Sequence, residues 1–225
     1  MNARPTTVPR SRGEATRQRL IDEAERQFSE SGFSGATLSG IAGACGLGNA
    51  GALHHFASKE KLYEAVLDRF ADSFESELQA IVDRHDTPGA RLRAALRHEA
   101  ARMAAHPRRY RLLLREMLDN PDRVERARAL PFTRYATGFC ALIAEAQAAG
   151  AAVTGPPALL LAQFLGTLSY ALVARPTFIR MDLAREVPRE ERGWIEAVAR
   201  AAERALLVDG AAGIVAMPAR SANEA

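Results

Sequence analysis

The stretch TLSGIAGACGLGNAGALHHF, residues 37–56, decides how the fold of this chain is to be interpreted. Its glycines at positions 46, 48 and 51 match the spacing G-x-G-x-x-G, which binds a dinucleotide pyrophosphate when a strand precedes it and a helix follows it. The preceding residues are small and repeat with helical spacing. Asp68, near the distance at which such loops place a ribose-binding acid, falls inside another helical pattern. The dinucleotide interpretation therefore lacks its structural context.

The same stretch instead predicts two short helices joined by a tight turn. Thr37 is a suitable N-cap for a first helix over residues 37–45, with Leu38, Ile41 and Ala42 facing the core. Gly46 suits the left-handed position that ends this helix. We therefore expect a chain reversal directly after Cys45.

A second short helix is expected over residues 49–56. Leu47 would fill the core between the two helices, and Leu53 and Phe56 would turn inward. The outward or sideways positions then hold small or polar residues: Ala50, Gly51, Ala52 and His54. A helix so small and uncharged suits close approach to a DNA major groove, as the second helix of a helix-turn-helix does.

The rest of the chain is also predicted to be helical. Apolar residues recur every four positions over residues 17–33, where Gly32 is a natural stop, and over a long helix at about 58–83 that Ser58 caps. Further helices are expected over 90–105, 108–118, 122–149 with a bend at Pro131, 157–174 and 189–207, the last two separated by Pro176 and Pro188. No segment alternates like a strand, so the expected fold class is all-α.

Composition indicates a globular protein without a disulfide framework. The chain has 225 residues, 48% of them hydrophobic, so we expect a sizeable core. Cys45 and Cys140 lie far apart without metal-ligand spacing, which predicts neither a disulfide nor a zinc site. Residues 1–20 lack the apolar core of a signal peptide, so a cytoplasmic protein is expected.

Charge is distributed unevenly along the chain. The net charge of +3 at pH 7 permits binding to a polyanion without requiring it. Residues 1–20 carry five arginines and one acid, whereas residues 31–58 contain no Asp, Glu, Lys or Arg. This pattern is consistent with a basic DNA-contacting arm before a compact domain, and equally with a flexible, solvated tail.

At these residues the sequence resembles the TetR family of transcriptional regulators. The family pattern R..I..A...F...G+..T....IA..AGVS.G.LY.HF..K..L corresponds to RQRLIDEAERQFSESGFSGATLSGIAGACGLGNAGALHHFASKEKL, residues 17–62. The matching residues are Ile21, Ala24, Phe28, Gly32, Phe33, Thr37, Ile41, Ala42, Gly46, His55, Phe56, Lys59 and Leu62. The pattern covers about a fifth of the chain, and it is specific because spacing and residue type agree over three helices.

The chain departs from the family pattern at four positions: Cys45 for Ala, Gly48 for Ser, Ala52 for a larger aliphatic residue and Leu53 for Tyr. Glycine is a tolerable N-cap, so Gly48 should weaken the start of the second helix only slightly. In the family the tyrosine usually contacts a phosphate. That role would pass here to His54, His55 or Lys59.

The resemblance implies four segments: a flexible basic arm over residues 1–12, a helix-turn-helix domain over 13–57, a helical regulatory and dimerisation domain over 58–208, and a loosely ordered tail over 209–225. We expect the arm and Lys59 to contact phosphates with Thr37, and Asn49 and His54 to contact base edges. For the two adjacent histidines, packing of one and solvation of the other is the alternative. The residues expected at the DNA are Arg12, Thr37, Asn49, Ala50, Gly51, His54, His55 and Lys59.

A homodimer is expected because one short helix gains specificity by pairing with a second copy on a palindrome. Residues 158–174 are uncharged and apolar nearly all round, and an apolar stripe follows on the last helix. A membrane span is one alternative, but residues 158–174 are short and polar for a bilayer. The other alternative is that they form the core of a single protomer. The expected interface residues are Ala162, Leu165, Gly166, Ser169, Trp194, Ile195, Val198 and Ala202.

The resemblance also implies a pocket for a small, largely apolar effector among the middle helices. Aromatic and methionine side chains at helical spacing are its candidate lining, although plain core packing explains the same pattern. These residues are Phe70, Phe74, Met103, Tyr110, Met117, Tyr135, Phe139 and Phe164. Polar contacts could come from His98, Glu99, Arg102, Glu116 and Arg134, for which solvated helix faces are the alternative.

The expected function is therefore that of a ligand-responsive transcriptional regulator, a repressor that binds a palindromic operator in double-stranded DNA as a dimer. The sequence contains no motif of a hydrolase, a P-loop or a metalloprotease, so we expect no enzymatic activity, cofactor, metal or membrane partner. A helical small-molecule-binding protein without specific DNA binding is the alternative.

Overall fold

The computed structural model describes residues 12–119 and 131–208. The regular elements in these two ranges are helices, and a single antiparallel bridge joins Ala152 to Leu207. The expected all-α class is confirmed for these ranges. The helices are α1 (Arg12–Gly35), α2 (Leu38–Ala44), α3 (Asn49–His55), α4 (Lys59–Arg84), α5 (Pro88–Ala105), α6 (Pro107–Asp119), α8 (Thr133–Ala148), α9 (Pro157–Arg180) and α10 (Glu191–Leu206).

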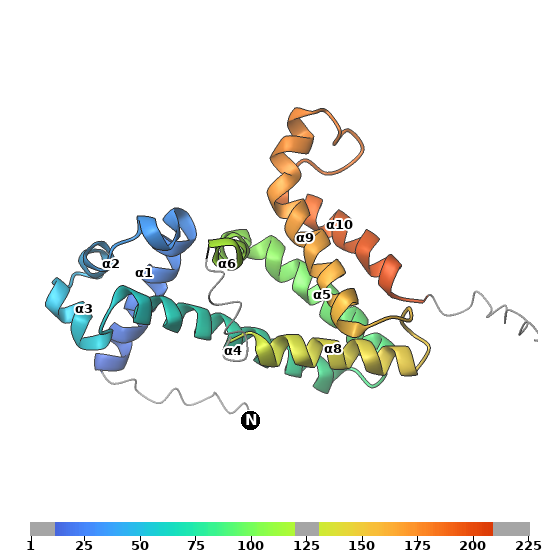
Figure 1. The fold of residues 1–225 in the computed structure, drawn as a ribbon, viewed down its shortest axis with the longest axis horizontal. Helices are drawn as coiled ribbons and strands as arrows, with labels where there is room; N and C mark the ends of the chain where they lie inside the picture. Colours follow the sequence, from blue (N-terminus) through green and yellow to red (C-terminus); the bar gives the residue numbers. More distant parts are fainter. Residues whose placement is uncertain (1–11, 120–130, 209–225) are drawn as a thin grey trace, which may run out of the picture.

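The N-terminal helices form a small unit at one end of the molecule (Figure 1). α1 packs against both α2 and α4, and α2 packs against α3. The centre of this unit consists of fully buried apolar side chains, among them Leu20, Phe28, Ile41, Ala52 and Leu62. Helix α4 runs from this unit into the rest of the molecule, so it belongs to both parts.

Local signals in the sequence place the ends of these helices as expected. Gly32 has a φ of 73° and interrupts the helical backbone near the end of α1. Thr37 caps α2 by accepting a hydrogen bond from the amide of Gly40 at 3.0 Å, and Gly46 follows α2 with a φ of 72°. Ser58 caps α4 by accepting from the amide of Lys61 at 3.3 Å.

The larger helical unit is built on the second half of α4 with α5, α8, α9 and α10. α10 packs along both α5 and α9, and α8 lies across α4, α5 and α9. α6 lies between this unit and α1, with contacts to both. The apolar core is continuous through the protein from Leu20 in α1 to Leu206 in α10.

Helix α9 is longer than the sequence predicts. It continues through Pro176 to Arg180, whereas the sequence predicts an end near Ala174. The ring of Phe178 packs edge-on against Tyr170 and against Trp194 of α10, with centroid distances of 6.4 and 5.9 Å. These contacts favour the extra turn despite the hydrogen bond lost at the proline.

Several expectations fall on residues outside the two described ranges. These are most of the basic arm, residues 122–130 of the helix expected over 122–149, and the tail. The described part of that helix begins at Thr133, so Pro131 lies before it in a turn rather than at a bend within it. Within the described part, α9 is long and apolar enough to cross a membrane by length and composition alone, with 33% of its most apolar window buried inside the protein.

Candidate nucleic-acid interface

The register of α3 differs from the prediction. Ala52 is fully buried and Phe56 is 5% exposed, so positions four apart form the inward face of the helix. Leu53 was expected to point inward with Phe56, but it is 44% exposed. Successive side chains of an α-helix point in directions about 100° apart, so a helix that buries Ala52 turns the side chain of Leu53 away from the core.

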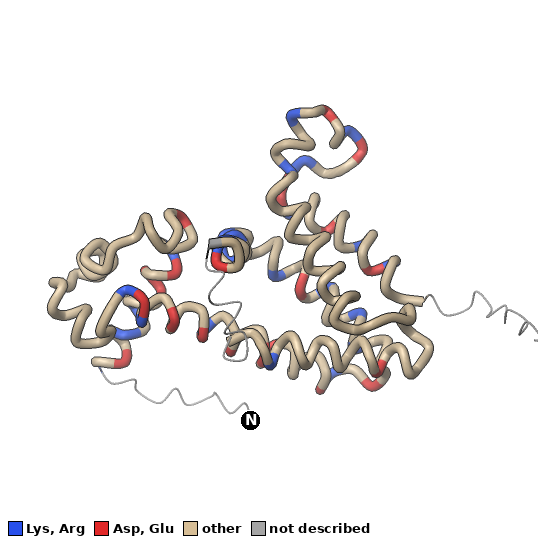
Figure 2. Tube along the Cα trace, viewed as in Figure 1, with Lys and Arg blue, Asp and Glu red and all other residues tan. Residues whose placement is uncertain are grey.

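The outer face of α3 is exposed and uncharged. Asn49, Ala50, Leu53 and His54 are exposed, and Gly51 and His55 are half-buried. A Cβ on Gly51 would lie 3.6 Å from the side chain of Leu47, which is ordinary contact. Figure 2 shows no charged residue along α2 or α3. This outer face resembles that of a groove-binding helix in its size and polarity.

Side chains from α1 hold the two short helices in place. Arg19 donates from Nη2 to the carbonyl oxygen of Cys45 at 2.7 Å, which satisfies the end of α2. The guanidinium of Arg17 lies 5.0 Å from the ring centroid of Phe56. Burial raises the pKa of the Cys45 thiol, which disfavours the reactive thiolate.

Lys59 has an internal contact that the sequence did not suggest. Its ammonium donates to the carbonyl oxygens of Phe33 at 3.0 Å and Ala36 at 3.2 Å, and lies 4.1 Å from the ring centroid of Phe33. These bonds fix the chain between α1 and α2 onto the first turn of α4. Two of the three ammonium hydrogens are therefore used inside the domain, which leaves one donor for a phosphate.

Two other residues expected at the DNA lie on the surface of this unit. Arg12 is exposed at the first turn of α1, and Thr37 is exposed at the start of α2. The Thr37 hydroxyl accepts from Gly40 and lies 3.3 Å from the hydroxyl of Ser39. Arg12 and Thr37 therefore remain candidates for phosphate contacts.

The residues expected to line an effector pocket form the core of the larger unit. All except Met117, which is 60% exposed on α6, are at most 6% exposed. Met117 was therefore wrongly assigned to the interior. Phe74 packs against Tyr110 and Tyr135 with ring centroids 5.9 and 5.4 Å apart. The buried aromatic side chains of this unit therefore pack on one another.

A polar cluster lies buried beside these rings. Glu99 is 2% exposed and Arg102 is 7% exposed, and their side chains form an ion pair. Tyr110 donates to Glu99 at 2.8 Å, while Nε of Arg102 donates to the Tyr110 hydroxyl at 2.9 Å. Tyr135 also donates to Glu99. From the sequence, Glu99 and Arg102 were expected either to contact an effector or to lie on solvated helix faces. Both side chains are buried, so the expectation of solvated faces is wrong for them.

The charges in this cluster shift the pKa values of its members. Burial and the Glu99 carboxylate raise the pKa of Tyr110 and Tyr135 well above the usual range for tyrosine. At its edge, burial acts to raise the pKa of Glu77, but hydrogen bonds with His98 and Ser73 and the charge of Arg102 outweigh it, so that pKa lies below its ordinary value. Glu77 is thus held as a carboxylate at neutral pH.

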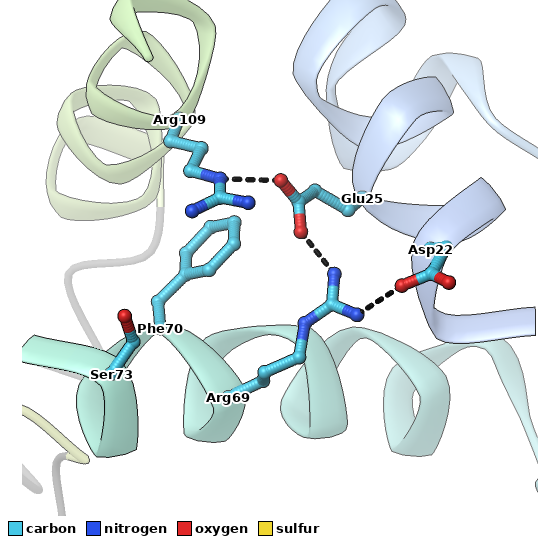
Figure 3. A pocket seen from close by; sticks show the side chains of 6 residues that line it. All are labelled: Asp22, Glu25, Arg69, Phe70, Ser73 and Arg109. Atoms are coloured by element: carbon cyan, nitrogen blue, oxygen red, sulfur yellow. Dashed lines mark hydrogen bonds and ion pairs between the residues drawn. The ribbon is translucent and has the colours of Figure 1, made fainter. Parts of the chain in front are cut away.

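Helices α1, α4 and α6 meet at a second group of charges (Figure 3). Glu25 of α1 pairs with Arg69 of α4 and with Arg109 of α6, and Arg69 also pairs with Asp22. The guanidinium of Arg109 lies 5.1 Å from the ring centroid of Phe70. These side chains line a pocket of about 380 Å³ between the N-terminal unit and the rest of the protein.

The predicted dimer residues divide into two groups. On α9, Ala162 and Gly166 are exposed, and Leu165 and Ser169 are half-buried. On α10, the prediction is wrong for Trp194 and Ile195, which are 7% and 0% exposed within the protomer. Trp194 donates from Nε1 to the carbonyl oxygen of Ala171 at 3.0 Å, so it joins α10 to α9. Val198 and Ala202 remain half-buried.

The exposed face of α9 is more apolar than the predicted set suggests. Leu159, Tyr170 and Val173 are 65%, 63% and 52% exposed and continue the line through Ala162 and Gly166. Among residues 12–119 and 131–208, no three His, Cys, Asp or Glu side chains gather as a metal site would require.

Comparison with known proteins assigns the N-terminal unit to a family model. The model described as bacterial regulatory proteins, tetR family, matches residues 20–66. The HTH-type transcriptional regulator RutR of Escherichia coli K12 is 35% identical over 115 residues, 50% of this chain and 53% of RutR. The HTH-type transcriptional repressor KstR2 of Mycobacterium tuberculosis is 31% identical over 109 residues, 41% of this chain and 54% of KstR2. The chain thus spans about half the length of these curated relatives.

Solved structures extend the likeness over most of the fold. A transcriptional regulator of the TetR family from Agrobacterium tumefaciens superposes with a TM-score of 0.68 at 19% identity, covering 87% of this chain and 100% of that chain. At this identity the likeness shows the fold alone. The structural likeness includes both the N-terminal unit and the larger helical unit.

Proposed function

We propose that this chain, whose residues 20–66 match the model of the tetR family of bacterial regulatory proteins, is a cytoplasmic transcriptional repressor that binds double-stranded DNA through α2 and α3. It acts as a homodimer on a palindromic operator. A small, largely apolar effector binds the larger helical unit and releases the DNA.

The observation that carries this proposal is the outer face of α3. Its exposed residues are uncharged. Arg19 of α1 holds the end of α2, Arg17 of α1 lies over the ring that follows α3, and Lys59 of α4 holds the chain between α1 and α2. A short helix held rigidly with such a face fits the major groove of B-DNA, which is about 12 Å wide. Asn49 and His54 are the residues proposed to bond base edges.

Phosphate contacts are proposed for Arg12, Thr37 and the third hydrogen of the Lys59 ammonium. Helices α2 and α3 carry no cation, so we expect each protomer to neutralise few phosphates. Binding should therefore weaken only moderately as salt rises, because the salt dependence grows with the number of phosphates contacted.

Release by an effector is supported by the position of α6. Arg109 of α6 and Arg69 of α4 share the carboxylate of Glu25 in α1, so a shift of α6 changes how the N-terminal unit is held (Figure 3). The aromatic core with Phe74, Tyr110 and Tyr135 lies against the same two helices, α4 and α6. An effector that parts these rings would act on α6 directly.

The test begins with selection of duplexes from a random pool by the purified full-length chain. We then measure the dissociation constant of the selected duplex by fluorescence anisotropy. His54→Ala should raise it by about tenfold or more, because one base-edge contact is lost. His106→Ala is the matched control, since His106 is an exposed histidine far along the chain from α3, and it should leave the constant unchanged.

Two results would overturn the proposal. The first is that no sequence is enriched, in which case a helical small-molecule-binding protein becomes the better interpretation. The second is that the two histidine variants behave alike on the selected duplex. Circular dichroism of each variant confirms that the helices are intact.

A further inference from the structure

The exposed side chain of Leu53 has a specific position on the proposed DNA-binding face. Leu53 follows Ala50 by three residues and Asn49 by four, so the three share one side of α3. All three are exposed, and Leu53 does not belong to the hydrophobic core. Single exposed leucines are common on protein surfaces. This one lies on the helix that is proposed to enter the groove.

The chemistry of this side of α3 favours one kind of base pair. Guanine is most often bound by the forked donors of arginine or by lysine, and residues 31–58 contain neither. Alkyl groups such as those of Ala50 and Leu53 instead suit the C5-methyl group of thymine, and an asparagine amide suits the N6 and N7 edge of adenine. A·T pairs present both features in the major groove.

We infer that Leu53 is a specificity-determining residue, whose side chain packs against the C5-methyl group of thymine within each operator half-site. Ala50 extends the same apolar contact, and Asn49 bonds an adenine beside it. The half-site beneath α3 is therefore rich in A·T pairs. This inference rests on the proposed function, because it concerns the same face.

The test replaces the thymines of the selected duplex by deoxyuridine, one position at a time. Deoxyuridine keeps the pairing edge and lacks only the methyl group. Loss of one buried methyl contact should raise the dissociation constant about fourfold, and substitution at the symmetric positions of both half-sites about fifteenfold. One or two positions in each half-site should show this effect, and thymines elsewhere should not.

Leu53→Ala assigns the effect to its side chain. In this variant the difference between thymine and deoxyuridine duplexes should disappear at the sensitive position. Leu118→Ala is the matched control, because Leu118 is also an exposed leucine, at the end of α6. It should keep the full sensitivity to the methyl group.

The outcomes separate this inference from the proposed function. If the chain enriches no sequence, both fail. If it enriches a sequence but deoxyuridine has no effect, or the half-site is rich in G·C pairs, or Leu53→Ala keeps the methyl sensitivity, the role of Leu53 is overturned and DNA binding stands.

Discussion

Gly46 shows how a single residue determines the geometry of the helix-turn-helix. Its φ of 72° is a conformation that L side chains rarely adopt, and an added Cβ would meet no atom within 4 Å. A substitution therefore changes only the backbone energy. Gly46→Ala should lower the free energy of unfolding by about 1 to 2 kcal/mol, because the left-handed conformation strains a residue with a Cβ. Urea unfolding followed by circular dichroism measures this change.

Gly43 provides the matched control within the same stretch. It also has open space around an added Cβ, but its backbone is helical, inside α2. Gly43→Ala should therefore raise the free energy of unfolding, by about 0.5 to 1 kcal/mol. Equal effects of the two substitutions, or a stabilising Gly46→Ala, would contradict the assignment of strain to Gly46.

At the scale of elements, the buried pair Glu99 and Arg102 joins helices that are distant in the sequence. Arg102 of α5 bonds Tyr110 of α6 and Tyr135 of α8, and it reaches Glu77 of α4 at 3.0 Å. Arg102→Met should lower the free energy of unfolding by about 3 to 5 kcal/mol, because it leaves the carboxylate of Glu99 buried without its cation. Chemical unfolding at neutral pH measures the loss.

Arg97→Met is the control for this prediction. Arg97 pairs with Glu203 at 2.9 Å, but its side chain is 64% exposed, and Arg93 still pairs with Glu203 at 3.2 Å without it, so its loss should cost less than about 1 kcal/mol. If Arg102→Met does not fold, the double variant with Glu99→Gln removes the unpaired charge and should restore the fold in part. A fall no larger than that of Arg97→Met would show that the buried pair is not what links these helices.

Elements set by local signals could be predicted from the sequence, whereas contacts between distant elements could not. Thr37, Gly46 and Ser58 determine helix ends through bonds to their own neighbours, so the short pattern was sufficient. The orientation of Leu53 was missed because α3 has only 7 residues, too few for a clear apolar period. No local signal around Lys59 indicates that its ammonium bonds carbonyl groups 23 and 26 residues away.

At the scale of the whole molecule, the apolar face of α9 should join two copies of the chain. Gly166 lies on this face, and an added Cβ would meet no atom within 4 Å, so a side chain there disturbs nothing within the protomer. Gly166→Glu should leave the unfolding of the protomer unimpaired, since glutamate favours a helix more than glycine does. It should raise the dimer dissociation constant by about 100-fold or more, because the interface would bury unpaired carboxylates.

Analytical ultracentrifugation over a range of concentrations measures this dissociation, and anisotropy with the selected duplex measures its consequence. Affinity for the palindrome should fall in the same variant, because two separate protomers no longer bind both half-sites as one unit. Ala101→Glu introduces the same charge on an exposed position of α5 and should leave both constants unchanged. If Gly166→Glu stays dimeric at the concentrations at which the parent protein is dimeric, the dimer contact lies on another face. If it dissociates but keeps its affinity for the palindrome, a single α3 helix is sufficient for recognition.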